Sequence, residues 1–426
     1  MRNSTLYNLS SMLFYLLLFR ASMDPILHLT KVGSIGLGAV LNLIMVAYFL
    51  YACAKSRMTI PRAFFSVWGL FIIIGLISII SSPDKVRSLR SFFVVLTYMS
   101  VFCLSAYFIR SKQDLAYMIK LVILSSLIPF AFTIFEFLNP ASSTTKDGFR
   151  LFGSFSHPNI YAFYLVLIAS LCLFVNKQKI LEFDQGLILL SKFVFVIALI
   201  FLILTKTRSA WGAFTIVITV YGTLAERRYL YYLLVVVALS LMIPTVHERV
   251  MDVFTSGPSI ENLEDGEALN SYAWRLVVWI ASWDYILAKP FLGHGYDTFS
   301  YYFLDFFPLE ESRGFDAHNT YVQIVFDMGF LGLVGYLLIF IAILKRLFTY
   351  FQWDKQGSTI IIGLVTSYLA VGYSDNILFY LSYNWYFWLI MGCCYFANPP
   401  AKSNNHREKD VNSINSQIST PIIGRH

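Results

Sequence analysis

Long apolar runs recur along nearly the whole chain, and they constrain its fold more than any other feature of the sequence. A run of about 18 or more apolar residues is long enough to cross a bilayer as an α-helix. Only 13% of the 426 residues are charged, whereas soluble domains average roughly a quarter. The mean hydropathy is +0.64. These observations predict an all-α polytopic membrane protein.

Twelve transmembrane helices are expected, and because three of the apolar runs are short, the count could also be eleven or thirteen. No clear small-residue cleavage site follows the first run, so we expect it to be retained as a helix. The expected organisation is about nine helices in 1–245, a long segment at 246–320, further helices in 321–397 and a disordered cytoplasmic tail at 398–426. The expected spans are roughly 7–27, 33–53, 61–80, 91–109, 115–138, 158–176, 187–204, 209–225, 229–245, 321–344, 359–375 and 379–397.

The distribution of Lys and Arg predicts the orientation of these helices. With the N-terminus inside, several basic turns fall on the cytoplasmic side, where positive charge normally collects. Both termini are then cytoplasmic, and the segment 246–320 faces outward. The outward side nevertheless retains cations, which indicates an anionic ligand, with loop solubility and contacts with lipid headgroups as the alternative. These cations are Lys85, Arg87, Arg90, Arg150, Lys206, Arg208, Arg275 and Arg313.

The outward segment divides into a loop, a helix and a turn. Residues 255–270 contain the Gly, Pro and acidic residues typical of a loop. Residues 271–287 show helical periodicity, and three tryptophans favour an amphipathic helix that lies at the level of the lipid headgroups. A Gly-His-Gly turn at 293–295 is expected after it. The tryptophans are Trp274, Trp279 and Trp283.

Two motifs on the same side carry candidate binding residues. At the start of the sixth span, His157 and Asn159 either line the entrance of a site or cap the helix. Between the seventh and eighth spans, Lys206 and Arg208 stand among hydroxyl residues, either as a tight turn or as a phosphate site. Arginine presents a planar fork that matches phosphate oxygens. Arg275 is a further phosphate candidate, with simple snorkelling to the interface as the alternative.

His318 is the candidate catalytic residue. Its reference pKa is near neutral, so it can accept a proton from a hydroxyl group at physiological pH. Asn319 follows it, and Gly329 and Gly332 are expected to let the next helix pack closely against a neighbour. The alternative is a histidine that caps the helix or lies at the interface. Catalysis is favoured because segments far apart in the sequence all bring their polar residues to the same membrane face.

Four acidic residues and Arg20 are expected to form ion pairs or to support the site. Arg20 and Asp24 are spaced i, i+4 in the first span and predict an intramembrane ion pair, although Arg20 could also reach a ligand. Glu136, Asp327 and Asp375 lie near the outer helix ends, where they could orient the arginines or His318.

Other classes of chemistry lack their sequence motifs. The chain has no Walker-type glycine-rich loop, no Gly-x-Ser-x-Gly elbow, no His-Glu-x-x-His and no Asp-x-Asp pair. ATP hydrolysis and metal-assisted transfer are therefore disfavoured, and neither a cofactor nor a metal site is expected. The basic residues lie mainly in connecting loops, so we expect no nucleic-acid partner.

At these residues the chain resembles the O-antigen ligase and O-antigen polymerase family of bacterial envelope glycosyltransferases. The resemblance covers roughly residues 151–340, and it includes the large loop between two late spans. The motifs that carry it are Gly-Ser-Phe-Ser-His-Pro-Asn at 153–159, Thr-Arg-Ser at 207–209, Gly-His-Gly at 293–295 and Ala-His-Asn-Thr-Tyr at 317–321, continuing to Gly332.

The resemblance implies a C-type glycosyltransferase-like helical bundle in the bacterial inner membrane, with its site facing the periplasm. Such enzymes take a glycan from undecaprenyl diphosphate without a metal ion. By the same resemblance, Arg208 and Arg275 would bind the donor diphosphate and His318 would act as the base. A polysaccharide polymerase for O-antigen, exopolysaccharide or capsule is expected ahead of a ligase that transfers to the lipid A core.

The expected partners are the lipid-linked oligosaccharide donor, a glycan or lipid A core acceptor and the membrane lipids, with a chain-length regulator or a flippase as further candidates. A function from a different class is transport, because a lipid-linked glycan flippase could also have twelve spans. A flippase should show two comparable halves and ionisable residues near the midplane. This chain instead concentrates its polar residues near one face, which favours the enzyme.

Overall fold

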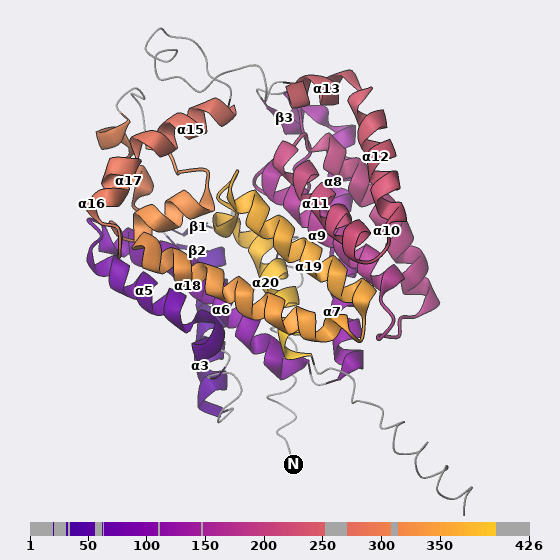
Figure 1. The fold of residues 1–426 in the computed structure, drawn as a ribbon, viewed down its shortest axis with the longest axis horizontal. Coiled ribbons are helices and arrows are strands. Elements are labelled where there is room, and N and C mark those ends of the chain that lie inside the picture. The colour runs from indigo at the N-terminus through magenta and orange to yellow at the C-terminus, as the bar shows by residue number, and fades with distance from the viewer. Residues whose placement is uncertain are drawn as a thin grey trace, which may run out of the picture.

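The structure is a computed structural model, and it describes residues 20, 31–32, 35–55, 62, 64–109, 111–145, 148–251, 271–307 and 314–397. Within these residues the chain is predominantly helical (Figure 1). The predicted first span, apart from Arg20, lies outside the described residues, as do Asp24, Arg313 and the predicted tail. In the described part the strands form two short hairpins: β1 (Lys31–Val32) with β2 (Ile35–Gly36), and β3 (Thr144–Thr145) with β4 (Gly148–Phe149).

The helices before the long connecting segment follow the predicted apolar runs closely. They are α3 (Leu37–Lys55), the π-helix η1 (Phe64–Trp68) that runs into α5 (Gly69–Ile80), α6 (Lys85–Phe108), α7 (Lys112–Ser125), α8 (Leu127–Leu138), the 3-10 helix η2 (Pro140–Ser143), α9 (Pro158–Lys177), α10 (Gln185–Leu204), α11 (Arg208–Leu224), α12 (Arg228–Leu241) and α13 (Pro244–Met251).

The second half of the chain begins with short helices and ends with three longer ones. They are α15 (Ser271–Ala281), α16 (Trp283–Ala288), α17 (Phe299–Phe306), α18 (Thr320–Phe351), α19 (Lys355–Gly372), the 3-10 helix η3 (Ile377–Phe379) and α20 (Leu381–Phe396).

Six stretches of helix in the described residues are long and apolar enough to cross a membrane. Every predicted span from the second onward coincides with one helix or with two consecutive helices, so the predicted positions of the helices are confirmed. The number of twelve crossings stays a prediction, since the other helices are shorter or less apolar. The six stretches are Leu37–Ala54, Lys85–Phe108, Lys112–Leu138, Pro158–Lys177, Gln185–Leu204 and Thr320–Phe351.

Helix α9 forms the centre of the bundle. It is the most buried of the six long stretches, with 89% of its apolar window inside the protein, and it packs against α10, α11, α19 and α20. A second part of the core is aromatic. The ring of Trp68 lies 4.7 Å from that of Trp388 and 6.0 Å from that of Phe102, which joins η1, α20 and α6. Aromatic pairs at these separations are favourable beyond the area they bury.

The helices at the periphery expose large apolar side chains. Leu189 and Phe193 of α10 are 71% and 65% exposed, and α12 has no buried residue. Soluble proteins rarely leave apolar faces of this kind uncovered. Together with the six long apolar stretches, these faces agree with a multi-pass membrane protein.

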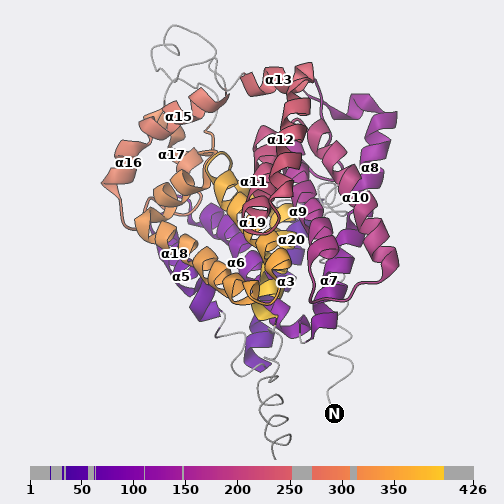
Figure 2. The same ribbon diagram turned by 45° about the vertical axis from the view of Figure 1, so that its right-hand side comes forward.

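Helices α15, α16 and α17 form a separate group beside the start of α18, which we call the α15–α17 cap. In both views it lies on the opposite side of the molecule from α10 (Figures 1 and 2). The cap has its own apolar core, in which buried residues of α15, α16 and α17 meet the first turns of α18. This core includes Val277, Val278, Ile286, Phe299, Phe303 and Phe326.

The single amphipathic helix predicted for 271–287 is divided in the structure. Ser282 separates α15 from α16, and its hydroxyl donates to the carbonyl oxygen of Trp279. Two of the three tryptophans pack inside the cap region: Trp274 contacts Phe303, and Trp279 Nε1 donates to the carbonyl oxygen of Ala317 at 2.6 Å. Both remain partly exposed and Trp283 is 49% exposed, so the role of the three tryptophans as headgroup anchors stays a prediction.

The cap is fixed to α18 by backbone pairing at the predicted Gly-His-Gly turn. The backbone N–H groups of His294 and Gly295 donate to the carbonyl oxygens of Phe326 and Asp327 at 2.9 and 3.0 Å, and the N–H of Phe330 donates to Pro290 at 2.7 Å. These bonds are possible because α18 is interrupted at Gly329, which has φ 67° and ψ −176°. The turn predicted at 293–295 is confirmed, and it acts as a clamp on the broken helix.

The two glycines predicted to allow close helix packing differ in what they do. A Cβ atom at Gly329 would lie 2.2 Å from the carbonyl carbon and oxygen of Phe291, so no side chain fits there. A Cβ atom at Gly332 would meet Met328 of the same helix instead. The close approach to a neighbouring helix occurs at Gly335, where a Cβ atom would lie 3.0 Å from the backbone of Phe71 in α5.

The change Gly329→Ala is expected to lower the melting temperature of the detergent-solubilised protein. With φ 67° and ψ −176°, the backbone of Gly329 lies in a region essentially restricted to glycine, and holding another residue there costs of the order of 1–3 kcal/mol. The overlap with the Phe291 carbonyl adds to this. Gly212→Ala in α11 is the matched control, because nothing lies within 4 Å of its Cβ position and alanine favours a helix. Equal melting temperatures for the two variants would contradict the role of Gly329.

Candidate functional site

His318 stands immediately before α18, but it is not the residue that caps the helix. Asn319 is the N-cap, and its Oδ1 accepts from the backbone N–H of Tyr321 at 2.9 Å and of Val322 at 3.1 Å. His318 has φ 47°, a left-handed conformation that is uncommon for residues other than glycine. The capping role considered for His318 is therefore wrong, and Asn319, predicted to bind substrate, caps the helix that His318 precedes.

The imidazole of His318 lies against α15. Its ring makes an edge-to-face contact with Trp274, with 6.2 Å between the ring centroids. Burial lowers the pKa of His318 below its usual 6.5, the positive charge of Arg275 lowers it further, and Asp375 opposes both effects. The imidazole is therefore neutral at pH 7 and can accept a proton.

Arg275 is held beside this imidazole by the loop that follows α19. Its Nη1 donates to the carbonyl oxygen of Ser374, and its charge acts on both His318 and Tyr380. The side chain is half-buried. A guanidinium in this position can place positive charge next to a group that reacts at His318.

Asp375 connects the beginnings of several helices. Its Oδ1 accepts from the hydroxyl of Tyr380 at 2.6 Å, and its Oδ2 accepts from Asn159 Nδ2 at 3.1 Å. Its backbone oxygen accepts from the hydroxyl of Thr320 at 3.0 Å. Asp375 thus ties the starts of α9 and α20 together through its carboxylate and the start of α18 through its backbone oxygen. It was expected to orient an arginine or His318, but its hydrogen bonds go to other groups.

His157 and Asn159 lie at the start of α9. His157 is the N-cap, and its Nδ1 accepts from the backbone N–H of Asn159 at 3.1 Å, so its capping role is confirmed. Burial and the charge of Arg150 lower the pKa of His157, and Asp375 partly opposes this. Since the charge of His157 also acts on His318, the two histidines face the same region.

Arg150 joins α9 to the turn between α10 and α11. Its Nε donates to the carbonyl oxygen of Thr205 at 2.9 Å, and its Nη2 donates to Asn159 Oδ1 at 3.1 Å and to Thr207 Oγ1 at 3.2 Å. The sequence marked Arg150 as an outward cation without assigning it to a site. An arginine directly after the β4 strand gives no local signal of this role.

Lys206 and Arg208 flank Thr207 in that turn. Lys206 has φ 53°, and Arg208 is the first residue of α11. Both side chains are half-exposed. They lie at the edge of the polar network around Asn159, which Thr207 joins through a hydrogen bond of 3.3 Å. The turn thus places two cations at this rim.

Two other acidic residues hold backbone segments rather than arginines or His318. Glu136 accepts from the hydroxyl of Ser143 at 2.8 Å and from the backbone N–H of Gly153 at 3.0 Å, which shapes the loop before α9. Asp327 accepts from the backbone N–H of Asp297, Thr298 and Phe299 at 2.9 to 3.2 Å, and therefore stabilises the start of α17.

Arg20 lies apart from this cluster. It is 4% exposed, its guanidinium lies 5.7 Å from the ring centroid of Trp385, and it lines a pocket that contains none of the other predicted site residues. Its predicted partner Asp24 lies outside the described residues. In the part of the chain that the structure describes, no three His, Cys, Asp or Glu side chains lie close enough together to hold a metal ion.

Residues 193–337 match the family model described as O-antigen ligase. The match supports assignment to the O-antigen ligase family. It confirms the resemblance inferred from the motifs. The matched region runs from α10 into α18 and contains Lys206, Arg208, Arg275, His318 and Asn319, whereas His157, Asn159 and Arg20 precede it. No curated protein matches the chain. The matched region thus includes the α15–α17 cap and the imidazole beside it.

Proposed function

We propose that the protein is a membrane glycosyltransferase that moves a glycan from undecaprenyl diphosphate to an acceptor sugar at the periplasmic face, as a polysaccharide polymerase. The observation that carries the proposal is the neutral imidazole of His318 beside the guanidinium of Arg275. One group can take a proton from a sugar hydroxyl, and the other can hold a diphosphate. Both lie in the region that matches the O-antigen ligase family.

In the proposed reaction, His318 accepts the proton of the acceptor hydroxyl as its oxygen attacks the anomeric carbon of the donor sugar. The bond between that carbon and the diphosphate oxygen breaks, and its electron pair leaves with undecaprenyl diphosphate. A single displacement of this kind inverts the anomeric configuration. A positioned base of this type contributes roughly 10²–10⁴-fold to the rate.

The diphosphate gains negative charge as it leaves. In this proposal Arg275, beside the reacting centre, and Arg208, at the start of α11, stabilise that charge through two-point hydrogen bonds. Lys206 adds positive charge at the same rim, and Asn159, which Thr207 contacts, and His157 line the site beside it. The proposed chemistry calls for no cofactor or metal ion, because the arginines supply the positive charge.

A ligase that transfers the glycan to the lipid A core is the second candidate, in keeping with the description of the matching family model as O-antigen ligase. Both reactions use the same donor and the same base, and they differ in the acceptor. Purified protein in liposomes, supplied with undecaprenyl-diphosphate glycan and with either lipid-linked glycan or lipid A core as acceptor, distinguishes them by the product that forms. Translocation of the donor without any joining of glycans would contradict both and support a flippase.

The rate of transfer is expected to fall as the pH drops below 6.5. The pKa of His318 is lowered from its ordinary value of 6.5, so the imidazole is mainly neutral at pH 6.5 and above. Protonation then removes the proton-accepting nitrogen as the pH falls through the lowered pKa. The measurement is kcat/KM against pH in detergent, with the amount of folded enzyme checked at each point. An acidic limb centred above 6.5 would contradict the role of a buried, cation-flanked imidazole.

A further inference from the structure

The helix cap of α9 fixes which nitrogen of the His157 ring carries the proton. The backbone N–H of Asn159 donates to Nδ1 of His157 at 3.1 Å, so Nδ1 is the acceptor in this bond and carries no hydrogen. Burial and the charge of Arg150 lower the pKa of His157, so the ring is neutral at pH 7 and its one hydrogen is on Nε2. His157 is therefore a hydrogen-bond donor through Nε2, and this nitrogen has no lone pair with which to accept a proton.

The Nε2–H group of His157 is open to a ligand. Within the described residues, the bond from Asn159 is the one hydrogen bond of the ring, so Nε2–H has no protein partner there. His157 is also exposed. The side chain of Asn159, in contrast, is already held on both sides. Its Oδ1 accepts from Arg150 at 3.1 Å and from Thr207 at 3.3 Å, and its Nδ2 donates to Asp375 at 3.1 Å.

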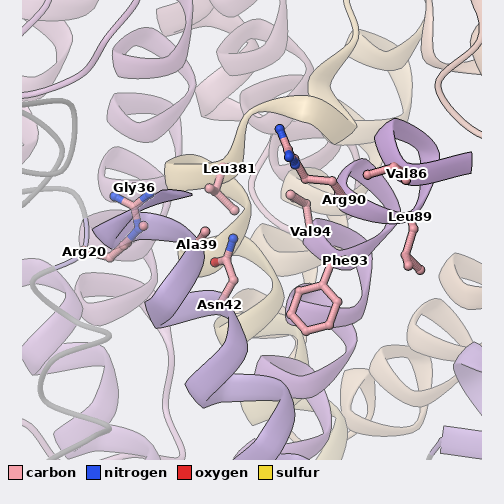
Figure 3. A pocket seen from close by; sticks show the side chains of 11 residues that line it. Arg20, Gly36, Ala39, Asn42, Val86, Leu89, Arg90, Phe93, Val94 and Leu381 are labelled. Atoms are coloured by element: carbon pink, nitrogen blue, oxygen red, sulfur yellow. The ribbon is translucent and has the colours of Figure 1, made fainter. Parts of the chain in front are cut away.

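The position of His157 favours an anionic ligand beside His318. The charge of His157 acts on the His318 ring, as does that of Arg275, whereas His157 does not line the pocket of about 510 Å³ between α3, α6 and the start of α20 (Figure 3). Arg275 donates to the carbonyl oxygen of Ser374 rather than to a carboxylate, and a guanidinium held in this way can still attract an anion. A phosphate oxygen accepts hydrogen bonds and donates none, so it matches an N–H group that only donates.

We propose that His157 binds the diphosphate of the lipid-linked donor, with its Nε2–H donating to a phosphate oxygen. This inference rests on the proposed function, and it gives the two histidines different roles. His318 accepts the proton of the acceptor hydroxyl, whereas His157 holds the leaving group and neither gains nor loses a proton. The hydrogen bond from Nε2 strengthens as the diphosphate gains negative charge, so it contributes to the rate as well as to binding.

Two substitutions separate this role from helix capping, because each replaces one nitrogen of the ring. His157→Asn puts an acceptor oxygen near the position of Nδ1, and asparagine is among the preferred N-cap residues, so α9 stays capped while the donor at Nε2 is lost. His157→Gln puts an amide N–H near the position of Nε2, but glutamine is not a preferred N-cap residue. The measurements are the melting temperature, the affinity for undecaprenyl diphosphate and the rate of glycan transfer, on the purified full chain in detergent.

His157→Asn should keep the wild-type melting temperature and weaken the affinity for undecaprenyl diphosphate by about 10–10²-fold, the scale of one hydrogen bond to a charged group. The rate of transfer should fall with it. His157→Gln should melt at a lower temperature and retain more of the affinity than His157→Asn. The same change at an exposed histidine of α13, His247→Asn, is the matched control and should leave affinity and rate unchanged.

A role in capping alone gives the opposite order of the two variants. Wild-type affinity and rate in His157→Asn, with losses confined to His157→Gln, would overturn the inference while the transfer reaction stands. If the wild type joins no glycans but its affinity for undecaprenyl diphosphate depends on His157 as described, the proposed reaction is wrong and the contact with the diphosphate is supported.

Discussion

Replacing His318 with alanine is expected to reduce glycan transfer by about 10²–10⁴-fold, the contribution of a positioned general base. The imidazole is the proton acceptor in the proposed reaction, and its lowered pKa keeps it in the neutral form. The fold should persist, because Asn319 rather than His318 caps α18. The measurement is the length distribution of polysaccharide on a gel, with membrane insertion and expression level verified for each variant.

His247→Ala in α13 is the control for this experiment, since His247 is an exposed histidine outside the cluster. It should leave the length distribution unchanged. Long polysaccharide made at the wild-type level by a well-expressed His318→Ala variant would rule out the catalytic role. Loss of product in both variants would point to a general effect on assembly rather than to a lost base.

Replacing Arg275 with alanine is expected to lower the rate by about 10²-fold, the order found when one charge-stabilising donor is removed from an active site. The same change should raise the pKa of His318, because the positive charge of Arg275 is one of the causes that lower it. The acidic limb of the pH–rate profile should therefore move to higher pH. A residue that serves only the fold would change the rate without moving this limb.

Arg275→Lys distinguishes charge from geometry. Lysine keeps the positive charge, so the acidic limb should stay close to its wild-type position, but it lacks the planar fork and should recover only part of the rate. The exposed Arg228, which pairs with Glu226, gives the control variant Arg228→Ala, and this variant should retain the wild-type rate and pH profile. An unchanged pH limb in Arg275→Ala would contradict the electrostatic coupling to His318.

The positions of the helices could be predicted from the sequence because hydropathy is a local property. Each apolar run from the second onward carries its own signal, and the helices formed where these runs lie. The candidate residues of the site could be selected for a similar reason: cations and histidines between apolar runs are conspicuous. What brings them together is not local. The bonds from Asp375 to Asn159 and from Arg150 to Thr205 join residues 216 and 55 positions apart.

The same limit applies to contacts within the cap. Trp274 and Trp279 have the spacing of interfacial anchors, and that spacing gives no sign of their contacts with Phe303 of α17 and with the segment before α18. Asp327 has the position of a residue that could orient the base, yet the N–H groups at the start of α17 occupy its carboxylate. In each case the partner comes from another segment of the chain. The residues next to the tryptophan or the aspartate in the sequence therefore give no sign of the contact.

The clamp between the Gly-His-Gly turn and the interruption of α18 limits how the site can open. Because residues 290–295 are bonded to the broken helix at Phe326, Asp327 and Phe330, the cap cannot lift away from this side as a free lid. A lipid-linked donor too large for the closed arrangement would have to displace the far end of α15 about this fixed point. Arg275 lies in α15. The movement that admits the donor would therefore also carry the guanidinium of Arg275 away from the imidazole of His318.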